Sequence, residues 1–340
     1  MTTLSDYISR ARPFDAALYE QALKRWNTLA KPRGALGLLE PMVARLCAIR
    51  PDLDFSRRCI LVFASDNGIC RENITESPSE VTSFLAELML QGKTSVAVMA
   101  KQAGADLLLY DVGMLTDVAG TIDKKICRGT KSFRRGPAMT REQAEQSVIT
   151  GIEAVRDRRE DYSLFCAGEI GIGNTSTSTA IASVLTGLPV SDITGPGSGL
   201  GEGGLERKIR VITEGIAANR PDPSDPLDLL ARLGGFDIGA MCGAFIGGAV
   251  YGVPVVMDGL ISSVSALLAV MLCPAARDYV IPSHASAEPA AAAVLDRLGM
   301  EAGLRFGMAL GEGTGAAALL PLLDMAIGVF EELPVFYEEG

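Results

Sequence analysis

The sequence has few of the residues from which metal centres and disulfide frameworks are built. His284 is the single histidine in 340 residues, and the seven cysteines are scattered, with no Cys-x-x-C pair. This pattern nearly excludes a structural zinc site, and an odd number of cysteines argues against a disulfide framework. We therefore expect no metal and no cofactor, and we expect mostly buried thiols in a reducing compartment, the cytoplasm.

Basic residues are scarce relative to acidic ones. The 31 Lys and Arg residues face 41 Asp and Glu residues, and the net charge of -10 repels a polyanion, so nucleic acid is not an expected partner. The chain starts without an apolar h-region, which predicts no secretory signal. Residues 238–257 carry no charge and are long enough to span a bilayer, but five glycines and Pro254 predict a helix, a turn and a short strand instead. We therefore expect no membrane partner.

Short apolar runs alternate with stretches of helical periodicity. The runs at 59–65, 105–113, 163–168 and 253–259 predict buried parallel strands, and the helices are predicted at 79–103, 141–158, 178–185, 204–218 and 260–272. Such alternation predicts an α/β fold in which helices cover both faces of a parallel sheet. Residues 1–50, with one loop at 31–37, and residues 286–340 are mainly helical. We predict that they form a small helical domain beside a large nucleotide- and base-binding domain of residues 51–285.

Two glycine-rich motifs are candidates for binding an anion or a nucleotide. GEIGIGNTSTSTA (168–180) follows a predicted strand and opens a helix, so its N–H groups with Asn174, Thr175 and Ser176 could hold an anion. A plain strand-to-helix turn with Ser and Thr caps explains it equally well. TGPGSGLGEGG (194–204) contains G-x-G-x-x-G, but no clear strand precedes it and no ribose-binding acid follows it, which disfavours a dinucleotide site.

Further polar residues follow predicted strands. FASDNGI (63–69) places Asp66 and Asn67 there, VMDGLISS (256–263) places Asp258, and SHASAEPA (283–290) contains Ser286 and Glu288. One such cluster is ordinary turn chemistry, but several at successive strand ends indicate a ligand crevice.

In the segment ALGEGTGAAALLPLLDMA (309–326), Glu312 lies between Gly311 and Gly313, and the residues around it are small or apolar until Asp324. Either the glycines make a tight turn and the carboxylate points into water, or the carboxylate is held where a substrate approaches the backbone closely.

Taken together, the motifs KPRGALGLLE, FASDNGI, SPSEVT, GEIGIGNTS, TGPGSGL, GGFDIGAM, PVVMDGLI, SHASAEP and LGEGTGAA resemble the nicotinate-nucleotide:dimethylbenzimidazole phosphoribosyltransferases, which activate the lower-ligand base of cobalamin. The resemblance covers residues 31–326 in the family's order. It implies a parallel six-stranded sheet with helices on both faces, a small helical domain from both termini, and a dimer. It also implies transfer of the phosphoribosyl group of nicotinate mononucleotide to a dimethylbenzimidazole-type base, giving an α-riboside 5′-phosphate and nicotinate without a metal.

The resemblance assigns roles to individual residues. Glu312 corresponds to the family's general base, and Glu169 to a second acidic position. Nucleotide and phosphate contacts fall in the motifs that hold Gly171, Gly173, Asn174, Thr175, Lys208 and Ser286. The remaining substrate-binding residues that we expect are Ser77, Leu85, Asp66, Asn67, Gly311 and Gly313.

Three residues depart from the family pattern. Asn67 replaces a common histidine, Pro196 replaces an arginine, and Leu85 stands where many benzimidazole-using members carry a glutamine. These departures leave open the same reaction on phenol, p-cresol or another base. They also leave open a non-catalytic subunit that forms a heterodimer with an active paralogue, although a homodimer is the first expectation. A generic nucleotide-binding oxidoreductase comes last, because its fingerprint is missing.

Overall fold

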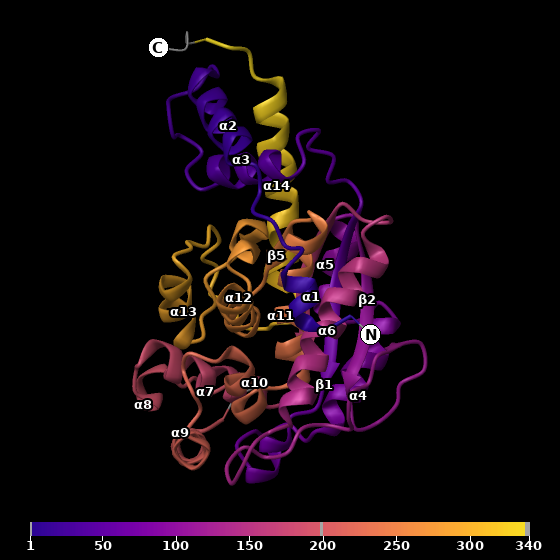
Figure 1. The fold of residues 1–340 in the computed structure, drawn as a ribbon, viewed down its shortest axis with the longest axis vertical. Helices are drawn as coiled ribbons and strands as arrows, with labels where there is room; N and C mark the ends of the chain where they lie inside the picture. Colours follow the sequence, from indigo (N-terminus) through magenta and orange to yellow (C-terminus); the bar gives the residue numbers. More distant parts are fainter. Residues whose placement is uncertain (1, 198–199, 337–340) are drawn as a thin grey trace.

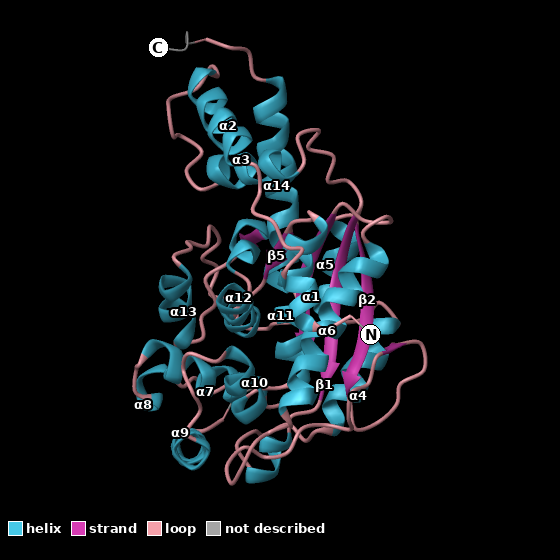
Figure 2. Cartoon of the chain, viewed as in Figure 1, coloured by secondary structure: helices cyan, strands magenta, loops and turns pink. Residues whose placement is uncertain are grey.

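The computed structural model describes residues 2–197 and 200–336, and it contains a six-stranded sheet with helices on both faces (Figures 1 and 2). The strands lie in the order β3-β2-β1-β4-β5-β6, and all neighbouring pairs are parallel. Their bounds are β1 Arg58–Ser65, β2 Ala105–Gly113, β3 Ile122–Asp123, β4 Leu164–Ile170, β5 Val255–Met257 and β6 Val280–Pro282. The predicted fold class is confirmed.

Fourteen α-helices and two 3₁₀-helices surround the sheet in the described part of the chain. They are α1 Leu4–Ile8, α2 Ala16–Thr28, α3 Leu39–Ile49, η1 Gly68–Glu72, α4 Glu80–Leu90, α5 Ser95–Gln102, α6 Arg141–Arg158, α7 Asn174–Thr186, α8 Val190–Ile193, α9 Glu202–Asn219, α10 Pro226–Leu233, α11 Phe236–Tyr251, α12 Leu260–Leu272, η2 Pro274–Tyr279, α13 Ala290–Leu298 and α14 Thr314–Glu332.

The single helix predicted at 79–103 is wrong, since the segment forms α4 and α5. Gly92 has a φ of 71°, which ends α4, and the Thr94 hydroxyl then accepts from the Ala97 N–H to cap α5. The helix predicted at 178–185 begins four residues earlier, at Asn174. The strand predicted at 253–259 is shorter, and forms only Val255–Met257. The helices predicted at 141–158 and 260–272 are confirmed.

The sheet is buried on both faces. In β1, Cys59, Leu61 and Phe63 face one hydrophobic cluster, and Ile60 and Val62 face the other. The first cluster includes residues of α6, α11 and α12, whereas the second includes residues of α3, α5 and α14. A strand buried on both faces has a continuous apolar sequence, which is why β1 could be predicted.

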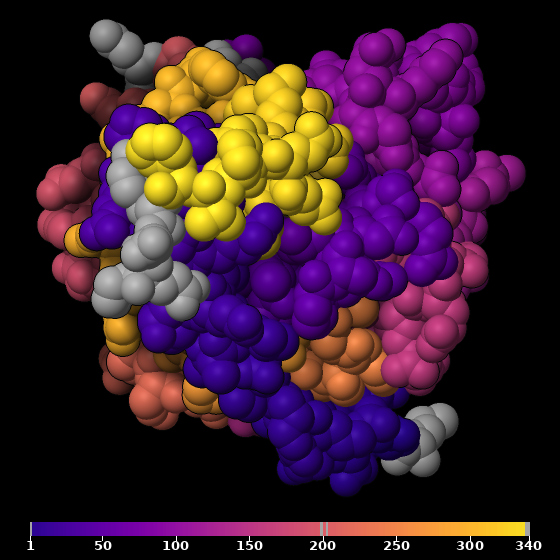
Figure 3. All heavy atoms as spheres, turned by 90° about the horizontal axis from the view of Figure 1, so that it is seen from above, coloured from indigo at the N-terminus to yellow at the C-terminus, as the bar shows by residue number. Residues whose placement is uncertain are grey.

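The two ends of the chain meet in a group of three helices. Trp26 of α2 packs against Phe330 of α14, with ring centroids 4.9 Å apart, and α3 contacts both helices. Figure 1 shows this group at the top, and Figure 3 shows the yellow end of α14 lying among indigo N-terminal residues. By contrast, α1 packs on α6 and α11, and α13 packs on α7 and α12. The division into two domains stays a prediction.

The uncharged stretch 238–257 forms most of α11, a turn and β5, as predicted, and α11 is buried from Phe236 to Ala249. Only α14 among the described helices is long and apolar enough to cross a membrane by length and composition. Half of it is buried inside the protein, against α3, α5 and β4, as in the core helix of a globular domain.

Candidate functional site

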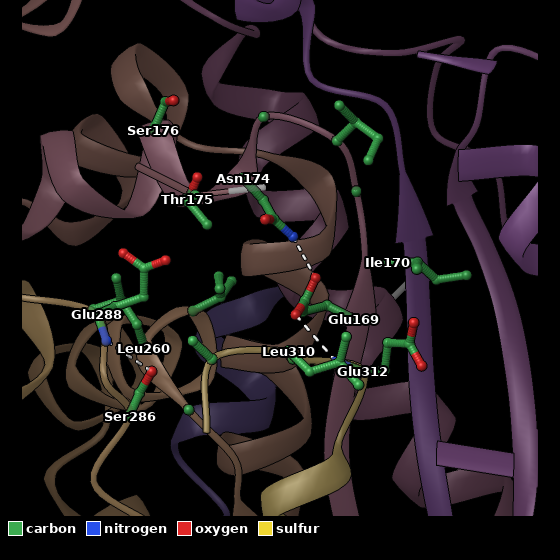
Figure 4. Close-up of a pocket in the computed structure, with 18 of the residues that line it drawn as sticks. Glu169, Ile170, Asn174, Thr175, Ser176, Leu260, Ser286, Glu288, Leu310 and Glu312 are labelled. Carbon is green, nitrogen blue, oxygen red and sulfur yellow. Dashed lines mark hydrogen bonds between the residues drawn. The ribbon is translucent and has the colours of Figure 1, made fainter. Parts of the chain in front are cut away.

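A cavity of about 300 Å³ opens where the strands end. Its walls come from the segments that follow β1, β4, β5 and β6 and from the turn before α14 (Figure 4). The strand order reverses between β1 and β4, and ligands of parallel sheets bind at the carboxyl ends beside such a reversal. Most of the expected site residues line this cavity, namely Ser77, Leu85, Glu169, Gly171, Gly173, Asn174, Thr175, Lys208, Ser286, Gly311 and Glu312.

Glu312 lies in a turn of left-handed backbone. Its φ is 63°, between 85° at Gly311 and 93° at Gly313. The side chain is only 7% exposed, and its Oε2 has no hydrogen-bond partner among the described residues. Burial raises the pKa of the Glu312 carboxyl, while the Val96 N–H lowers it in part and the Asp258 charge raises it further. The site therefore holds a partly desolvated carboxylate with one free acceptor atom.

Glu169, at the end of β4, reaches the same turn. Its carboxyl accepts from the Asn174 amide and, at 3.4 Å, from the Glu312 N–H (Figure 4). A Cβ at Gly311 would overlap with Glu169 Oε1, so glycine permits this approach. Burial raises the pKa of Glu169 well above its ordinary value, and the neighbouring Asp237 raises it further.

Asp237 extends this network behind the cavity. The Asn174 amide also donates to Asp237 Oδ2, at 3.1 Å. Asp237 lies in the first turn of α11, fully buried, and burial raises its pKa to about 7. We did not predict a role for Asp237 from the sequence, although it stands in the GGFDIGAM motif.

The start of α7 and Lys208 form an end of the cavity that can bind an anion. Lys208 is 1% exposed, and its Nζ donates to Thr175 Oγ1 at 3.1 Å and to the Gly195 carbonyl at 3.0 Å. Burial lowers the pKa of this ammonium, and the Glu288 charge opposes that shift. A buried cation beside a helix N-terminus is suited to a phosphate. Pro196 also lines this end of the cavity.

Ser286 belongs to the segment after β6. Its hydroxyl accepts from the Glu288 N–H at 3.3 Å, and both residues face the cavity (Figure 4). Glu288 was noted in the sequence as a strand-end residue but was not placed in the expected site.

A further part of the lining is apolar. Leu85 and Val81 come from α4, and Leu310 precedes the Glu312 turn. Ile74 and Ile170 complete the apolar surface, and the hydroxyl-bearing residues Thr75 and Ser77 line the cavity with them. Such a surface can bury a flat aromatic ring.

Three expected residues do not line the cavity. Asp66 accepts from the Leu115 N–H at 2.8 Å, and the Gly313 N–H donates to Asp258 at 3.1 Å. Asn67 is 1% exposed, and its side chain lies beside that of Asp237. The two side chains meet at Gly235, where an added Cβ would overlap with both. Asn67 thus lies behind the cavity lining, next to Gly171 and Gly173, and its role in binding stays a prediction.

Asp258 and His284 also line the cavity, although neither was among the site residues expected from the sequence. Asp258 was noted only as a strand-end carboxylate, and His284 only as the single histidine. Within residues 2–197 and 200–336, no three His, Cys, Asp or Glu side chains are arranged to hold a metal ion.

Comparison with known proteins extends over almost the whole chain. A family model described as phosphoribosyltransferase matches residues 11–340. The nicotinate-nucleotide–dimethylbenzimidazole phosphoribosyltransferase of Clostridium acetobutylicum is 40% identical over 338 residues, which cover 98% of this chain and 96% of that protein. The protein of the same name from Desulforudis audaxviator is 41% identical over 346 residues, 100% of this chain and 98% of that protein. A crystal structure of the Thermus thermophilus protein of this name superposes with a TM-score of 0.88 at 34% identity, and covers 95% of this chain and 97% of that one.

Proposed function

Because the chain belongs to the nicotinate-nucleotide–dimethylbenzimidazole phosphoribosyltransferase family, we propose that it transfers the phosphoribosyl group of nicotinate mononucleotide to a dimethylbenzimidazole-type base. The products are the α-riboside 5′-phosphate and nicotinate. One observation carries the proposal: a single cavity holds a buried lysine beside a helix N-terminus and a buried carboxylate with a free acceptor atom.

The nucleotide binds through its 5′-phosphate in this proposal. Lys208 and the hydroxyls of Thr175 and Ser286 donate to the phosphate oxygens, together with N–H groups at the start of α7. Charge-assisted hydrogen bonds of this kind are the strongest that a protein offers to an anion. The local donors explain how a protein with a net charge of -10 binds an anionic substrate.

The transfer step uses Glu312 as the base. One ring nitrogen of the benzimidazole attacks C1′ of the ribose, and the proton on its other nitrogen passes to Glu312. The bond from C1′ to the pyridinium nitrogen breaks, and its electron pair stays on the departing nicotinate. Attack on the face opposite the leaving group inverts C1′, which gives the α-anomer. A raised pKa makes the Glu312 carboxylate a better proton acceptor than an exposed one.

Glu169 and Asn174 have a different role in this proposal. The Glu169 carboxyl accepts from the Glu312 N–H and from the Asn174 amide, so it connects the turn with the nucleotide-binding helix. These two hydrogen bonds occupy the Glu169 carboxyl, and burial raises its pKa well above the ordinary value, so we assign the acceptance of the proton to Glu312.

We also propose that the chain acts as a homodimer in the cytoplasm. Large apolar side chains are exposed on three helices, with Phe84 of α4, Val98 of α5 and Met325 of α14 each more than half exposed. In the proposed dimer these side chains would be covered by the partner subunit. All seven cysteines are free thiols, which supports a reducing compartment. Light scattering on the purified chain tests the dimer, and a monomer at micromolar concentration would contradict it.

The reaction is tested by incubating the purified chain with nicotinate mononucleotide and dimethylbenzimidazole. We expect equimolar nicotinate and α-riboside 5′-phosphate by mass spectrometry. Parallel assays with phenol and p-cresol test the alternative bases. Absence of product from every base, with the nucleotide still bound, would indicate a non-catalytic subunit instead.

A further inference from the structure

The turn that carries Glu312 has an unfavourable backbone conformation. Gly311, Glu312 and Gly313 all have positive φ, and Glu312 has a Cβ that the left-handed region disfavours. Such a conformation persists only where the surrounding structure fixes it. The contacts that fix it come from the ends of three neighbouring strands.

Asp258, which follows β5, provides the main contact. Its carboxylate accepts from the N–H groups of Gly313 at 3.1 Å, Gly315 at 2.7 Å and Ala316 at 3.2 Å. These groups belong to the first turn of α14, which has no capping hydrogen bond from its own N-cap residue, Gly313. A carboxylate from another strand thus takes the place of the N-cap and interacts favourably with the helix dipole.

His284, which follows β6, lies against Asp258. Its Nδ1 is 3.7 Å from Asp258 Oδ1 and 3.2 Å from Ser283 Oγ, and the ring is 3% exposed. A Cβ at Gly315 would overlap with the imidazole, so only glycine lets the ring reach this position at the start of α14. His284 therefore limits the room in which the Asp258 carboxylate can move.

The end of β4 supports the turn from beneath. A Cβ at Gly168 would lie 2.5 Å from the Glu312 carbonyl oxygen, so this glycine lets the turn rest directly on the strand. Glu169 accepts from the Glu312 N–H on the same side. The backbone on both sides of Glu312 is thus fixed, and the direction of its side chain follows.

We propose that Asp258 is a positioning residue for the transfer reaction: it caps α14 and thereby holds the Glu312 carboxylate at the cavity, and His284 keeps Asp258 in place. This role rests on the proposed function of Glu312 as the base. Without the cap the strained turn relaxes and the carboxylate leaves its position. The phosphate-binding groups Lys208, Thr175 and Ser286 are not bonded to Asp258, so nucleotide binding is retained.

A double-mutant cycle between Asp258 and Glu312 tests the proposal. In Asp258→Asn only one of the two side-chain δ atoms can accept, so at least one α14 N–H loses its acceptor. Since small displacements of a catalytic group cost up to about 10²-fold, we expect kcat to fall by about tenfold or more. We expect the KM for nicotinate mononucleotide to change by less than about twofold, because the groups that bind its phosphate are unchanged. In the Glu312→Gln background, Asp258→Asn should cost no further activity, since residues that act as a unit are not additive.

Two further variants make the cycle decisive. Ser263→Ala removes the hydrogen bond from Ser263 Oγ to the Gly259 carbonyl in the turn after Asp258, and it should leave kcat near the wild-type value. His284→Asn should lower kcat less than Asp258→Asn, and its effect should also vanish in the Glu312→Gln background. If circular dichroism shows that Asp258→Asn does not fold, His284→Asn replaces it in the double-mutant cycle.

The outcomes separate the two proposals. If Asp258→Asn lowers kcat by the same factor in the wild-type and Glu312→Gln backgrounds, the positioning role is overturned and Glu312 remains the base. The same criterion applies to His284→Asn if that variant replaces Asp258→Asn in the test. A Glu312→Gln variant with wild-type turnover would overturn the base, and the positioning role with it.

Discussion

At the scale of single residues, the free acceptor of Glu312 connects the structure with the chemistry. A buried acceptor without a partner costs about 1–3 kcal/mol, and a ligand or an ordered water can supply the missing hydrogen bond. Oε2 of Glu312 is such an atom among the described residues, and it belongs to a side chain that lines the cavity. The N–H of an incoming base would supply the missing hydrogen bond and would also place the proton to be removed.

Lys208 carries the first prediction. Lys208→Met keeps the length of the side chain but removes the charge, and the loss of a charge-assisted hydrogen bond costs about 1.5–3 kcal/mol. The KM for nicotinate mononucleotide should therefore rise about 10- to 100-fold, with a smaller effect on kcat. Steady-state kinetics with saturating base measure both.

The neighbouring Arg207 provides the control for this prediction. It is exposed and donates to the Asn73 carbonyl outside the cavity, so Arg207→Met should change KM by less than about twofold. An unchanged KM in Lys208→Met would remove Lys208 from the phosphate site.

Few of these roles were predictable from local sequence. Glycines beside Glu312 suggested a close approach, but its role as a base came from the family resemblance alone. Asn174 and Asp237 are 63 positions apart, and no local pattern predicts that their side chains meet. Asn67 was expected near the base from the family resemblance, in which a histidine commonly stands at this position. Its side chain lies next to Asp237 and does not line the cavity, a contact that no local pattern predicts.

At the scale of elements, glycines bring α6 and α11 unusually close. A Cβ at Gly151 of α6 would overlap with the Ala240 carbonyl, and one at Gly243 of α11 would overlap with the Val148 carbonyl. α11 lies against β1, β2 and β4 and begins with Asp237, so this helix contact also helps to position the network behind Glu169.

Gly151→Ala is therefore expected to destabilise the protein. Overpacking costs about 1–3 kcal/mol, and here the obstacle is backbone that cannot move aside, so the loss should reach the upper part of this range or exceed it. Gly328→Ala in α14 is the matched control, because a Cβ there meets nothing within 4 Å. That variant should be neutral or more stable by up to about 1 kcal/mol. Urea denaturation measures both, and equal stabilities for the two variants would contradict the packing account.

The elements themselves were predictable in proportion to their length and periodicity. β1, β2 and β4 have long apolar runs, and α6 and α12 have clear ends, so the predictions for these were close. β3 and β6 have two and three residues, too few for a period, and only the resemblance implied six strands. The break between α4 and α5 depends on one left-handed glycine, which the helical pattern concealed.

At the scale of the whole molecule, the sheet topology gathers acidic groups from distant segments. Glu169, Asp237 and Asp258 are buried close to one another, and burial raises the pKa of each. Such groups couple the protonation of the site to the stability of the entire fold.

Asp237 makes this coupling measurable. Its pKa is about 7 in the folded protein against an ordinary 3.8, so the folded state binds a proton that the unfolded state releases. The contribution to the free energy of unfolding is therefore fully present below about pH 4, falls between about pH 4 and 7, and is constant above. Asp237→Asn does not titrate, so its stability should fall less than that of the wild type across this window.

Thermal unfolding midpoints at pH 4.5, 6 and 8 provide the measurement for this prediction. Asp237→Asn should gain stability relative to the wild type as the pH rises. A constant difference between the two proteins at all three values would show that Asp237 keeps an ordinary pKa.

The central claim is that Glu312 accepts the proton of the incoming base, and the turnover of Glu312→Gln tests it most directly. Glutamine keeps the shape of the side chain but cannot take up the proton, and a positioned base is worth roughly 10²- to 10⁴-fold in rate. With nicotinate mononucleotide and dimethylbenzimidazole both saturating, we expect nicotinate release to fall by about 10²-fold or more, while the KM for the nucleotide stays within about twofold. A variant that releases nicotinate at the wild-type rate would contradict the account.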